Sequence, residues 1–130
     1  MKIVLENSTG ELSYSHQDGQ QMLSVTEGQE CSLRCIAHGG YPPPKLQLQI
    51  GSRDISDEFD FENTAKMTGK SGLRVMHYIS QRFTQTFIAE AEDDGDRLKC
   101  IATVPGLIAN MTYVRLAVEC KHGRFFILLN

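Results

Sequence analysis

The chain has 130 residues, of which 41% are hydrophobic and 22% are charged, and its formal net charge is −3. This composition fits one globular domain with its own core, and it excludes a disordered segment and a membrane-embedded chain. The 13 lysines and arginines are scattered rather than clustered, so no basic stripe for phosphates is present and nucleic acid is not expected as a partner.

Residues 1–20 are polar and have no period, which predicts a linker or a loose first strand. The apolar run at the start of the chain is far shorter than the core of a secretory signal. The apolar run near the C-terminus is far shorter than the roughly 20 residues that span a bilayer. We therefore expect a domain over residues 21–120, a short apolar, unstructured tail over 121–130, and no membrane insertion by this chain. The chain is expected to be a piece of a longer extracellular protein or a product with aberrant ends.

The first strong strand is predicted at Cys31–Ala37, where alternate residues form an apolar file that includes Leu33 and Cys35. A short edge strand over 22–25 and a turn at Gly28 precede it.

The segment 38–44 contains three prolines in a row, which fix the backbone and remove donors, so it is predicted to be a stiff loop. Lys45–Ile50 then alternates without a fault and predicts a strand that buries Leu46, Leu48 and Ile50. The next segment, 55–70, is weakly patterned and indicates one short strand around Phe59 and Phe61.

The stretch 73–89 is rich in β-forming residues and predicts one long strand or two that break near Ser80. Two further inward files follow: Leu98, Cys100, Ala102, Val104, and then Val114, Leu116, Val118. About seven short strands and no helical period predict an all-β fold, an antiparallel sandwich.

Two stretches resemble a known family: Cys35 to Pro44, and Asp93-Asp94-Gly95 ahead of Leu98 and Cys100. They are similar to the C2-type immunoglobulin domains of cell-adhesion receptors, above all those of nectin-like and nephrin-like molecules, over about residues 21–119. The resemblance implies an immunoglobulin-like β-sandwich of about seven strands, pinned by a disulfide between Cys35 and Cys100, in an extracellular protein.

Two core positions depart from the family pattern. The chain has no tryptophan, and Leu48 occupies the place where most immunoglobulin domains pack a tryptophan on the disulfide. We expect neighbours such as Phe87 to fill the space. Leu98 stands where many members have the tyrosine of the corner motif, so that corner hydrogen bond is lost.

Cys31 and Cys120 share the inward parity of their strands and are expected at the same pole, which predicts a second bridge between them. The alternative is a buried thiol at Cys31 and a thiol in the tail at Cys120. Four cysteines in so short a chain indicate an oxidising compartment. A complete cytosolic protein with free thiols is the competing interpretation.

Two sequons, Asn7-Ser8-Thr9 and Asn110-Met111-Thr112, would carry glycans in a secreted protein. The four histidines show no metal-ligand spacing with each other or with the cysteines, and the acidic cluster at 90–96 lacks the ligand spacing of a calcium loop. No catalytic or nucleotide-binding motif occurs. We therefore expect neither an enzyme nor a bound metal or cofactor.

The expected function is protein binding at the cell surface, as an extracellular module of a cell-adhesion or recognition receptor. The partner would be a protein such as another immunoglobulin-superfamily ectodomain. The predicted contact residues are Tyr41, Pro42, Pro43 and Pro44, on a stiff loop beside 105–110. Alternatives are a structural spacer domain without a partner of its own and a soluble truncated fragment of a receptor.

Overall fold

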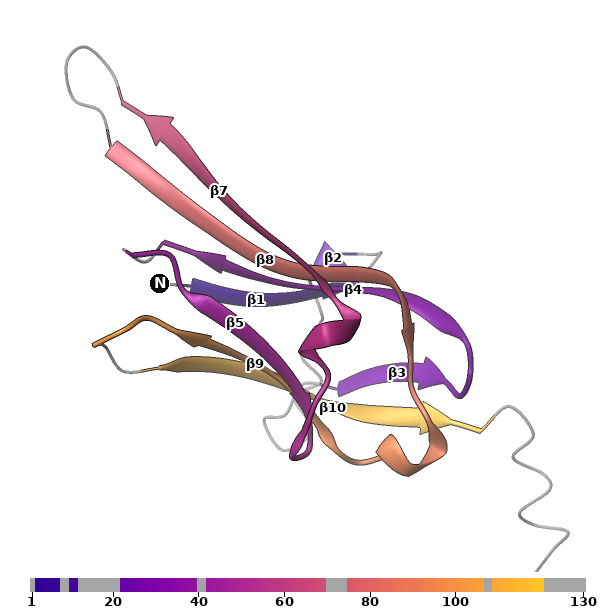
Figure 1. Cartoon of the computed structure of the whole chain (residues 1–130). Coiled ribbons are helices and arrows are strands. Elements are labelled where there is room, and N and C mark those ends of the chain that lie inside the picture. The colour runs from indigo at the N-terminus through magenta and orange to yellow at the C-terminus, as the bar shows by residue number, and fades with distance from the viewer. Residues whose placement is uncertain are drawn as a thin grey trace, which may run out of the picture.

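The computed structural model describes residues 2–7, 10–11, 22–39, 42–69, 75–106 and 109–120. Within these residues the chain is all-β, and its helical elements are two single 3-10 turns, η2 (Ser56–Glu58) and η3 (Ala91–Asp93). Two sheets pack face to face as a sandwich (Figure 1). The predicted all-β sandwich is thereby confirmed.

One sheet has the strand order β2 (Gly10–Glu11), β1 (Lys2–Asn7), β4 (Glu30–His38), β8 (Val75–Ile88), β7 (Asp60–Thr68). The other has the order β3 (Met22–Thr26), β10 (Asn110–Glu119), β9 (Arg97–Thr103), β5 (Lys45–Ile50), β6 (Arg53–Asp54). Described strand pairs are antiparallel, except that β3 runs parallel to β10. The order β1-β4-β8-β7 facing β5-β9-β10 is that of an immunoglobulin sandwich.

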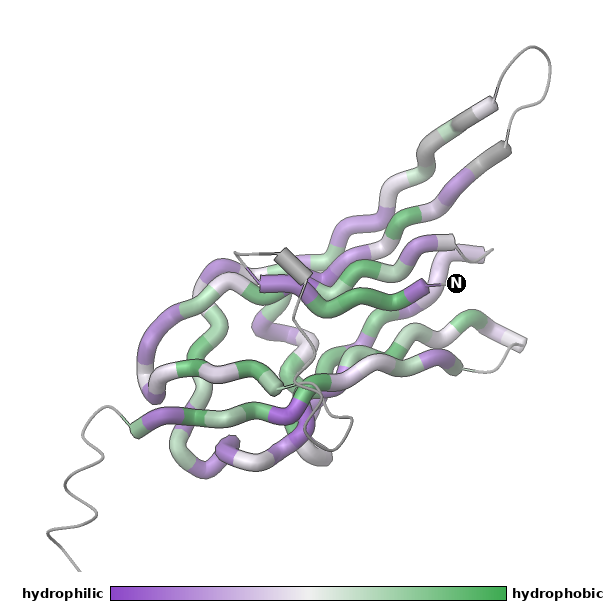
Figure 2. The backbone as a smooth tube through the Cα atoms, turned by 180° about the vertical axis from the view of Figure 1, so that it is seen from behind, coloured by the Kyte–Doolittle hydropathy of each residue, from purple (hydrophilic) through white to green (hydrophobic). Residues whose placement is uncertain are grey.

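The core is formed by the inward-facing files that the period of two predicts. Buried positions alternate with more exposed ones along β5 and β9, and the tube in Figure 2 changes between hydrophobic and hydrophilic colours along the strands. The buried files are Leu33, Cys35, Ala37, Leu46, Leu48, Ile50, Leu98, Cys100, Ala102, Val104, Val114 and Leu116. Each buried leucine or valine stabilises the fold by about 1.5 to 3 kcal/mol.

A disulfide between Cys35 of β4 and Cys100 of β9 crosses this core and joins the two sheets, with 6.5 Å between the Cα atoms. Leu48 lies opposite Cys100 in the pairing of β5 with β9 and is fully buried. Phe59 and Phe87 belong to the same core cluster, with ring centroids 6.3 Å apart. Their rings contribute apolar volume to a core that has no tryptophan.

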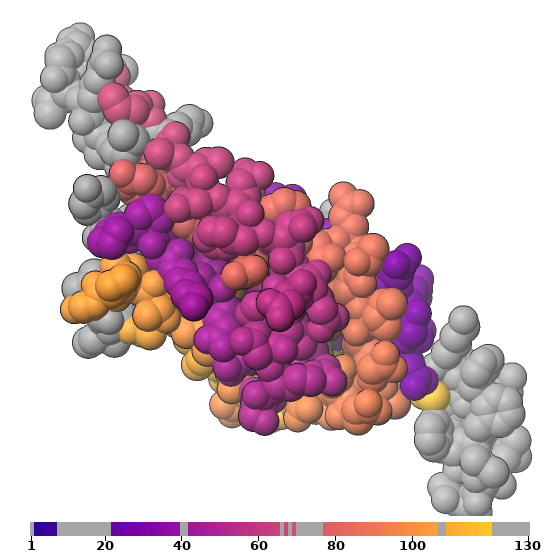
Figure 3. All heavy atoms as spheres, in the orientation of Figure 1, coloured from indigo at the N-terminus to yellow at the C-terminus, as the bar shows by residue number. Residues whose placement is uncertain are grey.

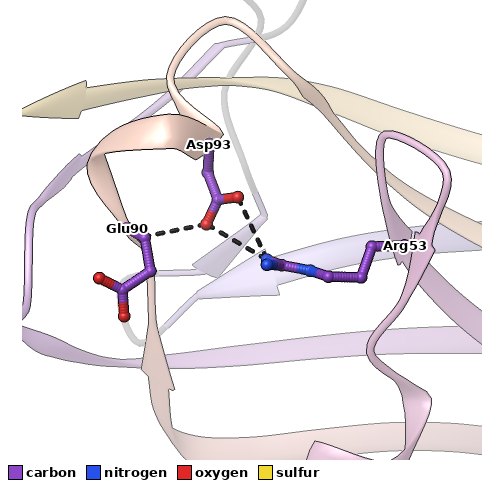
Figure 4. A network of polar contacts seen from close by, with 3 residues as sticks. All are labelled: Arg53, Glu90 and Asp93. Carbon is purple, nitrogen blue, oxygen red and sulfur yellow. Dashed lines mark hydrogen bonds and ion pairs between the residues drawn. The ribbon is translucent and has the colours of Figure 1, made fainter.

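The turn from β8 to β9 is closed by a buried carboxylate (Figure 4). Asp93 is 3% exposed, and it accepts hydrogen bonds from the Arg53 guanidinium at 3.1 Å and from the Glu90 backbone N–H at 3.0 Å. The backbone N–H of Gly95 donates to the Leu116 carbonyl, which ties the corner to β10. Leu98 is fully buried, so the corner is held without a tyrosine hydroxyl at that position.

β7 is longer than predicted, with nine residues. Of the two alternatives predicted for 73–89, one long strand or two that break near Ser80, the structure has the first, because β8 is a single strand of 14 residues. Ser80 is instead buried, and its hydroxyl donates to Asn63 of β7. The pairing of β8 with β4 has one register shift, which lies near the start of β4, between Cys31 and Leu33.

The segment 1–20, expected as a linker or a loose first strand, contains β1, which pairs with β4 over six residues. The expected tail, 121–130, lies outside the described residues.

Candidate protein-binding surface

The loops that the sequence predicts as a binding surface lie at one end of the sandwich. The end of β4, the start of β5, the turn between β9 and β10 and the far end of the β7–β8 hairpin all point the same way in Figure 1. The strand register supports this arrangement, because the start of β5 (Lys45) pairs with the end of β9 (Thr103), and the start of β10 (Asn110) pairs with the neighbouring Ala102. We call this end the loop pole.

Of the four predicted contact residues, two reach the surface of the loop pole. Tyr41 lies outside the described residues. Pro42 is exposed and Pro43 is half-buried, whereas Pro44 is fully buried. Pro44 continues the inward parity of Leu46, and this places its ring in the core. Its prediction as a contact residue is therefore wrong.

The β9–β10 side of the loop pole is exposed at Pro105, Gly106 and Asn110. Asn110 begins β10, and its side-chain oxygen accepts the Met111 backbone N–H at 3.0 Å. Asn7, the other sequon asparagine, is half-buried in β1, where Leu33 is its partner in β4. Glycosylation of either residue stays a prediction.

The β7–β8 hairpin extends beyond its own sheet. The last residue of β4, His38, pairs with Ile79, and the next backbone N–H, that of Gly39, donates to the Tyr78 carbonyl. The segment Val75–His77 of β8 therefore extends beyond β4, and it pairs with Lys66–Thr68 of β7. Figures 1 and 3 show this hairpin standing out from the body of the molecule. The sequence did not predict this projection.

One face of the hairpin carries large apolar side chains in contact with solvent. Phe61 is 45% exposed and Met67 is 50% exposed. The two are six residues apart in one strand, so they lie on the same face. Phe61 pairs with Arg82, which reaches toward the opposite sheet, so this is the core-side face of the hairpin. Exposed apolar side chains grouped on one element are typical of a protein contact.

Arg82 holds the base of the hairpin to the sandwich. Its Nε donates to the Leu46 carbonyl at 3.0 Å and its Nη1 to the Ser56 carbonyl at 3.4 Å. The same guanidinium lies 5.0 Å from the centroid of the Phe61 ring, a distance at which a cation attracts the face of a ring. Arg82 therefore orients Phe61 and connects the two sheets. Nothing in the sequence pattern distinguishes this arginine from the others.

The base of the hairpin is polar. Hydrogen bonds from Ser56, through its side chain and its backbone N–H, hold the pKa of Asp54 below its ordinary value. A hollow of about 320 Å³ lies beside this carboxylate and is lined by Lys45, Gln47 and Arg82, among others. The apolar face of the hairpin is therefore bordered at the base of the hairpin by hydrogen-bonding groups.

The predicted bridge between Cys31 and Cys120 is not formed, and both are free thiols. The Cys120 thiol contacts a Glu27 carboxylate oxygen at 3.3 Å, so it faces the turn after β3. A hollow of about 250 Å³, lined by Cys31 and Glu119, lies between the start of β4 and the end of β10. Burial raises the pKa of the Cys31 thiol, which lowers the fraction present as the reactive thiolate.

The acidic cluster of residues 90–96 has a structural use in the corner. The Asp93 carboxylate accepts the bonds described above, and Asp94 accepts the Val118 backbone N–H at 2.8 Å. Across the described ranges, no group of three or more His, Cys, Asp or Glu side chains is placed to hold a metal ion. No helix in the same ranges is long and apolar enough to cross a bilayer.

Solved structures share this fold. The crystal structure of Rst D1-D2 aligns with a TM-score of 0.53 at 15% identity, covering 89% of this chain and 48% of that chain. The ectodomain of mouse nectin-like molecule 4, with domains Ig1 to Ig3, aligns with a TM-score of 0.54 at 17% identity, covering 91% of this chain and 33% of that chain. The tandem Ig repeats of Dlar align at 0.49, with 16% identity, over 92% of this chain and 48% of that chain.

No model of a protein family and no curated protein matches the sequence. The chain spans about half of the Rst fragment and a third of the nectin-like ectodomain. At these identities the likeness shows the fold, which is immunoglobulin-like.

Proposed function

We propose that this chain is an extracellular, protein-binding module of a cell-adhesion or cell-recognition receptor, of the C2-type that nectin-like molecules contain. Two findings support the proposal. The fold is shared with the ectodomain of mouse nectin-like molecule 4, and a buried disulfide joins the sheets, as suits proteins of oxidising compartments. Immunoglobulin-like domains typically act by contact and not by catalysis.

The observation that carries the proposal is the projecting hairpin with its exposed apolar face. Phe61 and Met67 lie on β7, whose pairing with β8 continues beyond the end of β4. Arg82 of β8 ties the base of this hairpin to the opposite sheet. Backbone pairing of β7 with β8 along its whole length presets the positions of these side chains, which reduces the conformational entropy lost when a partner binds. Tyr41 and the exposed Pro42 would add contacts from the neighbouring loop.

The test is binding of the secreted chain, displayed on beads to gain from multivalency, to a panel of immunoglobulin-superfamily ectodomains that includes the chain itself. We expect at least one specific partner. The double variant Phe61→Ala/Met67→Ala is expected to lose about tenfold or more in affinity, as truncation of central apolar contacts does. Met22→Ala is the matched control, because Met22 is 42% exposed but lies on β3 of the other sheet.

A folded Tyr41→Ala protein is expected to bind more weakly as well. If no ectodomain binds above background, the chain is a spacer domain and the proposal is wrong. If a partner binds and both the double variant and Tyr41→Ala retain full affinity, the binding surface lies away from the loop pole.

A further inference from the structure

β7 is the longest of the four outer strands of the sandwich. It has nine residues, whereas β2, β3 and β6 have two, five and two. No described strand pairs with its outer edge. Each of its side chains with a described environment is exposed. Such an edge presents a row of backbone donors and acceptors that can pair with another strand.

The sequence of β7 is complementary to itself in the antiparallel direction. When Thr64 is set opposite the Thr64 of a second copy, Phe61 falls opposite Met67 and Glu62 falls opposite Lys66. Each of these pairs occurs twice, because the arrangement has a two-fold axis. Opposite charges and opposite apolar residues are the cross-strand pairs that stabilise an antiparallel ladder.

The pairing also sorts the side chains by face. Directly opposite residues of antiparallel strands lie on the same face of the sheet. The two Phe61–Met67 pairs therefore share the core-side face, and the two Glu62–Lys66 register positions share the other face. Burial of Phe61 and Met67 against each other would remove two of the large exposed apolar side chains of each copy from water.

An edge protected against pairing has different features. Natural proteins shorten such strands, or place a proline, a bulge or a charge on their inward-facing positions. β7 is long, contains no proline, and its pairing with β8 runs without a register shift. Its core-side positions Phe61, Asn63, Ala65 and Met67 carry no charge. Apart from the charged residues Asp60, Glu62 and Lys66, β7 has none of these protective features.

From this complementarity we infer that two copies of the chain associate edge to edge through β7, with the two-fold axis beside Thr64. The β2-β1-β4-β8-β7 sheet of one copy would then continue into the same sheet of the second copy. The contact is isologous, because each copy contributes the same strand. The inference rests on the proposed function and names its partner as a second copy of this chain.

A charge swap tests the inference. In a dimer of the Glu62→Lys variant or of the Lys66→Glu variant, like charges of the two copies face each other at both 62–66 pairs, and self-association is expected to weaken by about 10- to 30-fold. A mixture of the two variants restores both opposite-charge pairs and is expected to form heterodimers with the original affinity. Sedimentation equilibrium over a concentration series measures self-association of each variant and of their mixture. Cys31 and Cys120 are alkylated beforehand in order to exclude disulfide-linked dimers.

A second variant tests the register. A cysteine introduced as Thr64→Cys lies next to its own copy across the two-fold axis, so oxidation is expected to link two chains through that residue. Glu62→Cys, two residues along the same strand, is the matched control, because its two copies are separated by about 13 Å along the strands. Peptide mapping identifies which residues are linked.

Each result separates the inference from the proposed function. A wild-type chain that stays monomeric at every concentration overturns the inference, and binding to another ectodomain in the panel would then leave the proposed function standing. Dimers that the charge variants leave unchanged also overturn it, because the contact then lies on another face. A monomer that binds nothing in the panel overturns both.

Discussion

Position 48 shows how this core replaces a residue that most related domains contain. Leu48 lies opposite Cys100 and is fully buried, in the place that a tryptophan takes in most immunoglobulin domains. Phe59 and Phe87 lie in the same cluster. Among the described residues, every buried side-chain nitrogen or oxygen atom has a hydrogen-bond partner. Leucine in place of tryptophan at position 48 therefore leaves no buried polar atom unpaired.

A tryptophan at this position should not restore a better core. We expect Leu48→Trp to lower the free energy of unfolding by about 1 to 3 kcal/mol, because the core is already filled and an indole would displace its neighbours. Urea denaturation followed by circular dichroism measures the change. Leu48→Ala, expected to cost about 2 to 5 kcal/mol, is the control for burial. A more stable Leu48→Trp protein would show that the space beside the disulfide is empty.

Asp93 and Arg53 form the ion pair of the corner, but their environments differ. The Asp93 side chain is 5% exposed and that of Arg53 is 54% exposed. We expect Asp93→Ala to cost about 1 to 3 kcal/mol, because the variant loses a buried carboxylate and leaves the Glu90 backbone N–H without its acceptor. Arg53→Ala should cost at most about 1 kcal/mol, as exposed ion pairs do.

Thermal or urea unfolding measures the stability lost in Asp93→Ala and in Arg53→Ala. Equal losses would mean that the ion pair alone, and not the capping of the 3-10 turn, holds the corner.

Residue-level sequence patterns predicted the buried files and missed the tertiary contacts. Leu46, Leu48 and Leu98 are inward because of a local period of two, which a sequence displays. Arg53 and Asp93 are 40 residues apart, and no local pattern connects them. Pro44 was assigned to the loop because of its neighbours, although it has the parity of Leu46.

At the scale of elements, strands with one buried face were predicted well. Lys45–Ile50 alternates faultlessly, and β5 has these same bounds. The strand β7 was predicted as short because its side chains from Asp60 to Ala65 are exposed on both faces, and a strand without a buried face has no hydrophobic period. Tertiary pairing with β8, not the local pattern, makes it a strand.

The projecting part of the hairpin should open more readily than its base. Backbone amides of Val75–His77 are expected to exchange with solvent faster than those of Ser80–Phe87, because the former segment pairs with β7 and extends beyond β4. Hydrogen exchange followed by mass spectrometry on dilute protein measures this, with the amides of β4 as an internal reference. Equal protection along all of β8 would contradict the projecting arrangement.

At the scale of the whole molecule, two sheets joined by one disulfide present a hairpin and two loops at the same end. The chain-entropy estimate for closing a loop of 65 residues is about 4 kcal/mol. This is a large share of the roughly 5 to 15 kcal/mol that stabilises a typical domain. The surface proposed for recognition therefore depends on a scaffold that the disulfide stabilises, and such a bond persists in oxidising compartments.

The most direct test is a non-reducing peptide map with thiol alkylation, on protein secreted from eukaryotic cells behind a supplied signal peptide. We predict a linked pair of peptides that contain Cys35 and Cys100. Cys120 should be alkylated in the folded state, and Cys31 only slowly, because burial raises the pKa of its thiol. A soluble, folded protein with four alkylated thiols would contradict an extracellular immunoglobulin-like domain.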